Sequence, residues 1–187
     1  MTLLQIYVAP HSVLKKKAEP VEKVTDELRV FMQDMLETMY ENEGVGLAAP
    51  QVGISKRILI IDAEQKQGMD NPQDRKGNPL FIINPEITWA SEETREYEEG
   101  CLSLPDQYAV VERPKKVKIK YIDYNGNDCE IEADALLATA IQHEIDHLDG
   151  ILFVDHLSKL KRDMVLKKLK KFVKINQEEL AETHVIL

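Results

Sequence analysis

The segment His143–His147 (HEIDH) constrains this chain more than any other part of its sequence. It lies within residues 134–149, where apolar residues recur at the spacing of a helix: Leu137, Ile141, Ile145 and Leu148. On a helix, His143 and His147 lie one above the other on one face, where two imidazoles can grip one divalent metal ion. Glu144, beside the first histidine, can then reach a water held in an open coordination position.

The residues around this motif suit a metal site. Thr139 and Ala140 lie one turn before the histidines, and their small side chains leave room there. Gly150 is a suitable residue to end the helix. The alternative is a buried helix whose two histidines are merely hydrogen-bonded, because short motifs produce false matches.

A working metal site needs a third protein ligand and an open position. Three candidates lie downstream of the motif: His156, Glu178 and His184. Upstream, Cys101 follows a glycine within a polar stretch, residues 98–105, which suits a reactive or metal-ligating thiol. We expect Cys101 to be the third ligand.

Composition narrows the class of protein. With 187 residues, 43% of them hydrophobic and 30% charged, the chain is expected to form one soluble globular domain, residues 1–187. It has no apolar run long enough for a transmembrane helix, and its first residues lack the pattern of a signal peptide and indicate a short strand. Two cysteines are too few for a disulfide framework, which favours a reducing compartment.

Local patterns predict the remaining elements. Helical spacing indicates a helix over residues 25–40 with Thr25 as its N-cap, and residues 57–62 read as a short buried strand. Residues 64–79, with two prolines and two glycines, indicate an exposed loop. A strand is expected over residues 80–89, interrupted at its Asn-Pro dipeptide.

The second half of the chain begins with a clear alternation of apolar and charged residues. Residues 115–131 indicate a hairpin that turns at Asn125–Gly126 and places Cys129 inward as a buried thiol. Residues 151–154 indicate a short strand. A terminal helix is expected from Leu157 onward, with four residues on its apolar side: Leu160, Met164, Leu169 and Phe172.

A glycine-rich stretch, residues 44–53, marks a loop whose backbone takes unusual dihedral angles or approaches another group closely. It is not a phosphate-binding loop, because the glycine spacing is wrong and the Lys-Ser/Thr ending is missing. Gln51 is a lone amide in apolar surroundings. Taken locally, the stretch favours a tight turn with a surface glutamine.

Charge is distributed unevenly. Residues 159–174 hold eight Lys or Arg and one Asp, a net charge of +7, which leaves −16 on the rest of a chain whose total is −9. The total argues against broad nucleic-acid binding, including DNA. The basic helix has three competing interpretations: a solvated face, contact with an anionic membrane, or contact with RNA.

Three stretches together resemble the signature motifs of peptide deformylases: residues 44–51 (GVGLAAPQ), 99–103 (EGCLS) and 142–147 (QHEIDH). They occur in the family's order and at similar separations, and the likeness covers nearly the whole chain. The resemblance implies an α+β fold with antiparallel β-sheets wrapped around a central metal-binding helix, followed by a C-terminal α-helix. The implied reaction is hydrolytic removal of the N-formyl group from the N-terminal formylmethionine of nascent polypeptides, releasing formate.

Carried over residue by residue, the resemblance implies three metal ligands: Cys101, His143 and His147. It makes Glu144 the general acid/base, which takes a proton from metal-bound water and returns it to the departing amine. The side-chain amide of Gln51 and the backbone N–H of Leu102 become donors to the oxyanion. The implied cofactor is one divalent metal per chain, natively Fe(II), with Zn, Ni or Co as substitutes.

The expected substrate site surrounds these residues. The loop formed by Gly44, Val45 and Gly46 could bind the substrate backbone as an added strand. We expect the methionine pocket beside Val45 and three residues of the metal helix: Leu136, Thr139 and Ala140. Glu99 and Gly100 complete the set.

The sequence departs from the family's common pattern at residues 10–14, in a longer loop at residues 65–79, and at Tyr108, where many relatives carry arginine. These departures put contacts at the rim of the site in doubt, but not the chemistry. Arg113 can pair with Glu99 or Asp146 and so brace the metal ligands, or it can be a solvated charge.

Two other functions compete with a deformylase. A zinc peptidase would cleave unformylated peptides and use a third ligand other than Cys101. A non-catalytic metal-stabilised or nucleic-acid-binding module would have a closed four-ligand site, or no metal. We expect a monomer in the bacterial cytoplasm without membrane attachment, which docks transiently on the ribosome through the basic helix and tail, residues 159–187.

Overall fold

A computed structural model describes residues 2–65, 72–176 and 185–186. Its main sheet has five antiparallel strands in the order β2-β3-β4-β7-β8. The strands are β2 (Gly46–Ala48), β3 (Ile58–Ile61), β4 (Leu80–Ala90), β7 (Val117–Ile122) and β8 (Asp128–Ala133). β2 and β8 are the edge strands of this sheet.

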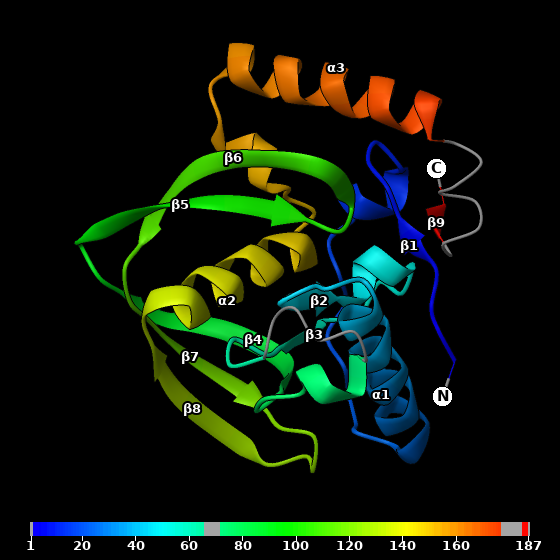
Figure 1. Ribbon diagram of the computed structural model, residues 1–187. Helices are drawn as coiled ribbons and strands as arrows, with labels where there is room; N and C mark the ends of the chain where they lie inside the picture. Colours follow the sequence, from blue (N-terminus) through cyan, green and yellow to red (C-terminus); the bar gives the residue numbers. More distant parts are fainter. Residues whose placement is uncertain (1, 66–71, 177–184, 187) are drawn as a thin grey trace.

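The central helix α2 (Ala135–Leu148) lies between this sheet and a long antiparallel hairpin (Figure 1). The hairpin consists of β5 (Thr94–Cys101) and β6 (Leu104–Pro114). The expected α+β fold, with antiparallel sheets around the motif helix, is therefore confirmed.

Two further helices cover the outside. Helix α1 (Asp26–Glu41) packs beside β2 and β3, and helix α3 (Lys159–Ile175) lies across the far side of the hairpin (Figure 1). Near α3, β1 (Ile6–Tyr7) pairs in parallel with β9 (Val185–Ile186). The short 3₁₀ turns are η1 (Ser12–Lys15), η2 (Ala49–Val52), η3 (Pro72–Arg75) and η4 (Phe153–His156). None of the described helices is both long and apolar enough to cross a membrane.

The apolar stripe of α2 fixes this helix against the sheet. Ile141 and Leu148 are fully buried in a cluster with β3, β4 and β7 residues such as Leu59, Ile82 and Ile119. Burying one such side chain typically contributes about 1.5–3 kcal/mol, so the stripe determines which face of α2 turns away from the sheet. That other face carries the histidines.

The predicted first helix is confirmed, including its N-cap. The Thr25 hydroxyl accepts a hydrogen bond from the backbone N–H of Leu28 at 3.3 Å. Met32, Met35 and Met39 are fully buried, which agrees with a core-filling role. The hairpin at Asn125–Gly126 is also confirmed, with Gly126 at a φ of 91°.

Several local predictions differ from the structure in detail. The interruption predicted at the Asn-Pro dipeptide is a bulge and not a break: β4 continues from Leu80 to Ala90, but its pairing with β7 shifts register there, and Asn84 adopts a φ of 51°. Its side chain also exchanges two 2.8 Å hydrogen bonds with the backbone of Val21. Residues 153–156 form the turn η4 and not a strand, because the Asp155 carboxylate accepts from the backbone N–H of Leu152 at 2.9 Å and stabilises the turn.

The apolar side of the terminal helix is shifted from the one predicted. Leu160 and Met164 are 73% and 53% exposed, whereas Leu169 is buried against the hairpin. Cys129 is half-buried and not fully buried, because it lies on edge strand β8. The predicted exposed loop, residues 64–79, lies partly outside the described residues, and within its described part Arg75 is buried.

Candidate metal centre

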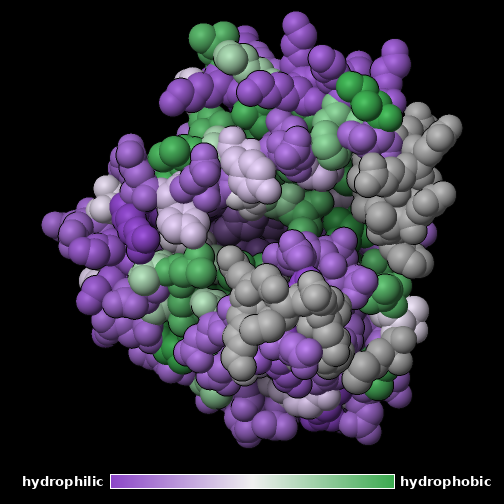
Figure 2. Space-filling model, in the orientation of Figure 1, coloured by the Kyte–Doolittle hydropathy of each residue, from purple (hydrophilic) through white to green (hydrophobic). Residues whose placement is uncertain are grey.

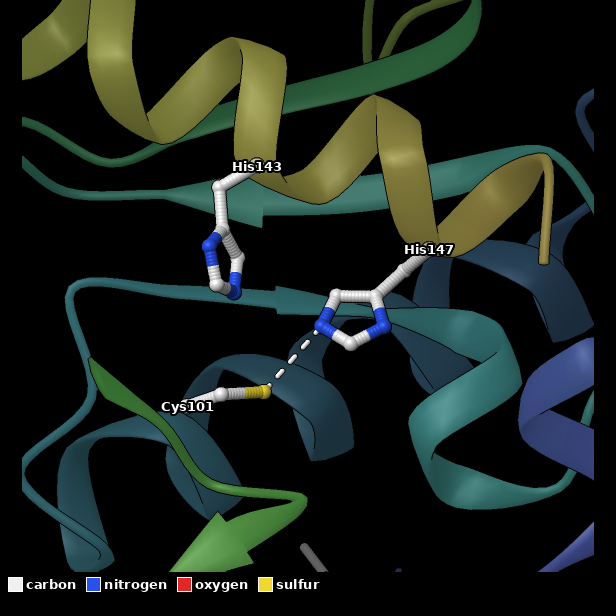
Figure 3. Close-up of side chains that lie close together, drawn as sticks. All are labelled: Cys101, His143 and His147. Atoms are coloured by element: carbon white, nitrogen blue, oxygen red, sulfur yellow. Dashed lines mark hydrogen bonds between the residues drawn. The ribbon is translucent and has the colours of Figure 1, made fainter. Parts of the chain in front are cut away.

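The three side chains predicted as metal ligands lie together. His143 and His147 project from one face of α2 toward Cys101, at the end of β5 (Figure 3). The ligand atoms of all three lie within 4.8 Å of one another, and Cys101 Sγ is 3.2 Å from His147 Nε2. Both histidines are buried, and Cys101 is half-buried.

The hairpin register explains how Cys101 reaches the helix. Gly100 pairs with Tyr108, whereas Cys101 pairs with Leu104, so residues 105–107 form a bulge in β6. Such bulges bend a strand and re-aim its side chains. Gly100 lets the Tyr108 ring pack against the backbone here, since a Cβ atom would lie 2.6 Å from that ring.

A buried carboxylate orients the first histidine. His143 Nδ1 is 2.8 Å from Glu99 Oε2, which leaves its Nε2 atom to face Cys101 and His147. Burial alone would raise the pKa of Glu99, but hydrogen bonds from His143 and Arg113 outweigh burial and lower that pKa to about 2. Glu99 is therefore a carboxylate at neutral pH.

Arg113 bridges two acidic residues behind the ligands. Its Nη2 atom donates to Glu99 Oε2 at 3.0 Å, and its Nη1 atom donates to Asp146 Oδ2 at 2.8 Å. The interpretation of Arg113 as a solvated charge is wrong, because this residue is only 5% exposed. His156, a candidate third ligand in the sequence, contacts Asp146 at 2.7 Å instead of joining the cluster. Two further candidates for the third ligand, Glu178 and His184, lie outside the described residues.

Glu144 is a buried carboxylate beside the cluster. It is 4% exposed, and its Oε2 atom has no hydrogen-bond partner among the described residues. Burial raises the pKa of Glu144 to about 7, although the nearby charge of His143 opposes this rise. Gly46 lies against it so closely that a Cβ atom there would be 2.4 Å from Glu144 Oε1. The glycine therefore leaves space for this carboxylate.

The local interpretation of Gln51 as a surface side chain is wrong. Gln51 is 1% exposed within turn η2. Its Oε1 atom accepts from the backbone N–H of Ala48 at 2.8 Å, which fixes the amide orientation. The Nε2 atom then lies 3.5 Å from Cys101 Sγ and 3.3 Å from Ser103 Oγ. The amide N–H groups are consequently aimed into the site.

A cavity of about 590 Å³ opens beside these residues, and Figure 2 shows the hollow on the face below the hairpin. All of the residues predicted to bind substrate line it: Gly44, Val45, Gly46, Glu99, Gly100, Leu136, Thr139 and Ala140. Gln51, Leu102 and Glu144 line it too. The sequence analysis missed several rim residues, among them Tyr97, Glu98 and Gln107, because only the hairpin pairing brings them to the cavity.

The donor set fits a divalent metal ion. Two imidazoles and a thiol are borderline-to-soft ligands, and tetrahedral sites with such ligands place neighbouring donor atoms roughly 3.5 Å apart. Burial and the charge of His143 lower the pKa of His147, which favours the neutral imidazole that binds metals. Burial also opposes a proton on His143, but hydrogen bonds with Cys101 and Glu99 outweigh it and raise the pKa of His143. Anionic surroundings that favour a proton also favour a metal cation.

Nitrogen and sulfur ligands, a buried carboxylate and an adjoining cavity together have the composition of a mononuclear metallohydrolase centre. The family model that matches the sequence, over residues 3–163, is that of polypeptide deformylase. The chain belongs to this family, whose members remove the N-formyl group from nascent peptides.

Individual relatives support the same family assignment. The chain is 50% identical over 174 residues to a peptide deformylase of Phenylobacterium zucineum, covering 93% of this chain and 99% of that protein. The crystal structure of peptide deformylase from Ehrlichia chaffeensis superposes with a TM-score of 0.86 at 42% identity, covering 94% of this chain and 99% of that one. A second structure of the Ehrlichia protein, in complex with actinonin, gives a TM-score of 0.82 at 44% identity, covering 91% and 98%.

Replacing Arg113 by leucine should weaken metal binding about 10- to 100-fold, which is typical when a group that orients a ligand is lost. Removing Arg113 leaves Glu99 uncompensated and free to turn away from His143. Metal affinity would be measured by competition with a chelator on protein whose fold is checked by circular dichroism. Arg95→Leu is the matched control, because Arg95 is an exposed β5 residue that stacks on Tyr97. Unchanged affinity in folded Arg113→Leu would contradict the bracing role.

Proposed function

We propose that this chain deformylates peptides at the cavity beside Cys101, His143 and His147, with Glu144 as the group that moves the proton. The observation that carries this proposal is the buried Glu144 Oε2 atom, which lacks a partner among the described residues and adjoins the three side chains that could hold a metal ion. An isolated buried carboxylate is costly, so a chain retains one where it serves chemistry.

Cys101, His143 and His147 would hold one divalent metal ion, natively Fe(II), with Zn, Ni or Co as substitutes. When bound, such an ion supplies Lewis-acid chemistry, which makes water nucleophilic near neutral pH and polarises the formyl oxygen. The protein keeps the three ligand side chains in place through Glu99, which holds His143, and through Arg113 behind it.

Glu144 performs both proton transfers in this proposal. Its raised pKa, about 7, suits a group that must accept a proton from the attacking water and then release it to the leaving amine. Breaking the bond between the formyl carbon and the amine nitrogen yields formate and a free amino terminus. The carboxylate returns to its starting state because each proton that it takes is passed on.

Gln51 and Leu102 would stabilise the negative charge that develops on the formyl oxygen. The Gln51 amide is already oriented by Ala48, so it needs no rearrangement when charge appears. Leu102 follows Cys101 directly, which places its backbone N–H beside the sulfur ligand. One such donor is typically worth about 2.7–4 kcal/mol of the activation barrier.

Glu144→Ala should lower kcat for formate release from formyl-Met-Ala-Ser about 10²- to 10⁴-fold, because the proton carrier is lost. The assay would use protein loaded anaerobically with Fe(II), with metal content measured in parallel. Glu132→Ala, which changes an exposed glutamate of β8, should retain full activity. Absence of formate release from the folded, metal-loaded wild type would reject the proposal.

The methionine side chain of the substrate would occupy the part of the cavity beside Val45, Leu136, Thr139 and Ala140. Ala140 and Thr139 are each 7% exposed, and their small side chains leave this volume open one turn before His143. The Gly44–Gly46 segment leads into edge strand β2, to which an extended peptide backbone could add.

Ala140→Phe should raise KM for formyl-Met-Ala-Ser at least about tenfold, because the added ring fills the space of the methionine side chain. Steady-state kinetics would measure KM and kcat separately. Ala90→Phe introduces the same ring at an exposed residue of β4 and should leave KM unchanged. An unaltered KM in Ala140→Phe would place the methionine elsewhere.

The rival functions make different predictions at the same site. A zinc peptidase would cleave an unformylated Met-Ala-Ser peptide, and a non-catalytic module would turn over neither peptide. The nearness of Cys101 to both histidines disfavours the peptidase, which would use another third ligand. We further propose a monomer in the bacterial cytoplasm that acts on emerging chains.

We also propose transient docking of α3 on the ribosome, whose surface is largely anionic RNA. The exposed basic residues of α3 stand on an otherwise acidic protein, and Figure 2 shows this hydrophilic helix along one border of the molecule. Deleting residues 159–187 is a poor test, because Leu169 is part of the core beside the hairpin.

Reversing Lys167, Lys170 and Lys174 to glutamate should instead abolish salt-dependent ribosome binding while leaving formate release from free peptides unchanged. All three are exposed. Co-sedimentation with ribosomes over a salt series measures the binding. Reversal of the exposed Lys16, Lys23 and Lys120 is the charge-matched control. Equal loss in both triple variants would show that only the net charge matters.

A further inference from the structure

The segment that leads from α1 into β2 forms one rim of the cavity. Glu43, Gly44, Val45 and Gly46 all line it, and β2 is an edge of the main sheet. In the proposed function, this segment receives the substrate backbone. The position of its peptide groups therefore matters for peptide binding, and the structure shows what determines that position.

The segment begins with a strained turn. Glu43 adopts a φ of 57°, the left-handed conformation that residues other than glycine, asparagine and aspartate rarely adopt. Its backbone N–H donates to the Tyr40 carbonyl at 3.1 Å, and that of Gly44 donates to the Met39 carbonyl at 2.9 Å. These bonds end α1 and send the chain toward β2. Interactions outside the turn must compensate for the strain.

Arg75 supplies such interactions from a distant part of the chain. It is 8% exposed and lies in turn η3, beside α1 (Figure 1). Its Nη1 atom donates to the Tyr40 carbonyl at 2.8 Å, and its Nη2 atom donates to Glu43 Oε1 at 2.9 Å. One planar guanidinium thus holds both the last turn of the helix and the left-handed residue. The single ammonium of lysine could not reproduce this fork.

Asp62 anchors the segment that carries Arg75. This carboxylate is fully buried and accepts from Tyr40 Oη at 2.6 Å and from the backbone N–H groups of Gly77 and Asn78 at 2.8 and 3.1 Å. Burial and the hydrogen bond to Asp62 raise the pKa of Tyr40 well above its usual value, so the phenol stays a donor. Tyr40 is therefore held at its carbonyl by Arg75 and at its hydroxyl by Asp62.

The glycine segment is also held on its own backbone. Gln65 Nε2 donates to the Gly44 carbonyl at 2.9 Å, and the backbone N–H of Asp62 donates to the Val45 carbonyl at 2.9 Å. The contacts of Arg75, Asp62 and Gln65 converge on a short stretch of chain at the cavity rim. The Glu43 carboxylate is 74% exposed, so its ion pair with Arg75 contributes little to stability. The effect of this ion pair is therefore on the position of the turn.

We propose that Arg75 is a positioning residue for peptide binding: it fixes the turn at Glu43 so that the Gly44–Gly46 backbone is presented to the substrate chain. Arg75 does not line the cavity and acts through Glu43 and Tyr40. The inference rests on the proposed function. It adds that Arg75, from turn η3, tunes affinity for the peptide and not the chemical step.

The test compares Arg75→Met with Arg29→Met, a matched control on helix α1. Arg29 also bonds one backbone carbonyl, that of Tyr124 at 3.1 Å, and one carboxylate, that of Asp26, but it lies outside the set of residues that line the cavity. Arg75→Lys is included because it retains the charge without the fork, and it serves if Arg75→Met does not fold. Two readouts are used: steady-state formate release, and calorimetric affinity of the metal-loaded protein for the product Met-Ala-Ser.

Arg75→Met should raise KM for formyl-Met-Ala-Ser and Kd for Met-Ala-Ser by roughly three- to thirtyfold with kcat retained, as expected for loss of uniform binding. KM for N-formylmethionine, which has little backbone to bind, should change less. Arg75→Lys should be intermediate, and Arg29→Met should leave KM and Kd unchanged even where thermal stability falls.

Several results would overturn the proposal. A lower kcat with unchanged KM in Arg75→Met would mean that only the folded fraction has fallen. Equal Kd and KM in Arg75→Met and wild type, or equal rises in Arg29→Met, would remove the positioning role, and so would a wild type that does not bind Met-Ala-Ser. If the wild type binds Met-Ala-Ser but releases no formate, the deformylase proposal fails, and the Kd values of the variants still decide the role of Arg75.

Discussion

Helix α2 has an apolar side and a polar side, and both must be buried. The sheet and the hairpin are arranged to cover these two sides. Ten of the fourteen residues of α2 are buried, so it is not a surface helix with one solvent-exposed face. One side is apolar and packs on the main sheet, whereas the other buries Gln142, His143, Glu144 and His147. Buried polar groups are costly unless they find partners. The β5–β6 hairpin supplies partners for Gln142, His143 and His147, whereas Glu144 Oε2 has none among the described residues. The hairpin accordingly lies on the polar side of this helix.

The partners are matched one by one. Gln142 donates to the Pro114 carbonyl at 3.0 Å, His143 contacts Glu99, and His147 contacts Cys101. Arg113 also balances the charge of Glu99, because a buried carboxylate is costly unless it is paired. The observed docking of hairpin and helix therefore pairs the buried carboxylate of Glu99 with the guanidinium of Arg113. The same docking places the sulfur beside the imidazoles, so the polar balance of the core and the geometry of the site have a common origin.

Much of the fold and of the candidate site could be predicted from the sequence, and the reason differs from one element to the next. The period of the apolar residues in α1, α2 and the β7–β8 hairpin follows directly from helix and strand geometry, and Thr25 is an ordinary N-cap. The grouping of Cys101 with the two histidines could be predicted because a metal site needs a third donor and Cys101 follows a glycine in a polar stretch; the family resemblance implied the same residue. The β4 strand was predicted with a break because the Asn-Pro dipeptide looks disruptive in isolation. In the fold, Val21 satisfies the Asn84 side chain from across the chain.

Features that depend on long-range contacts were not predictable. No local signal distinguishes Gln51 as buried, since its partners Cys101 and Ser103 lie about fifty positions away along the chain. Arg75 sits in a polar stretch that resembles any exposed loop, and only the tertiary fold brings it to Tyr40. The outward position of Leu160 and Met164 likewise depends on where the hairpin meets α3.

The small parallel pair β1–β9 links the two ends of the described chain to the site. Ile6, one of the two β1 residues, lines the cavity, and its strand partner is Val185. The cavity wall is thus supported by residues that are almost the whole sequence apart. Affinity tags, fusions or trimmed ends, which are usually treated as neutral in protein engineering, would here lie close to the strands that support the cavity wall. The end of the chain that carries a purification tag should therefore be chosen with this cavity in mind.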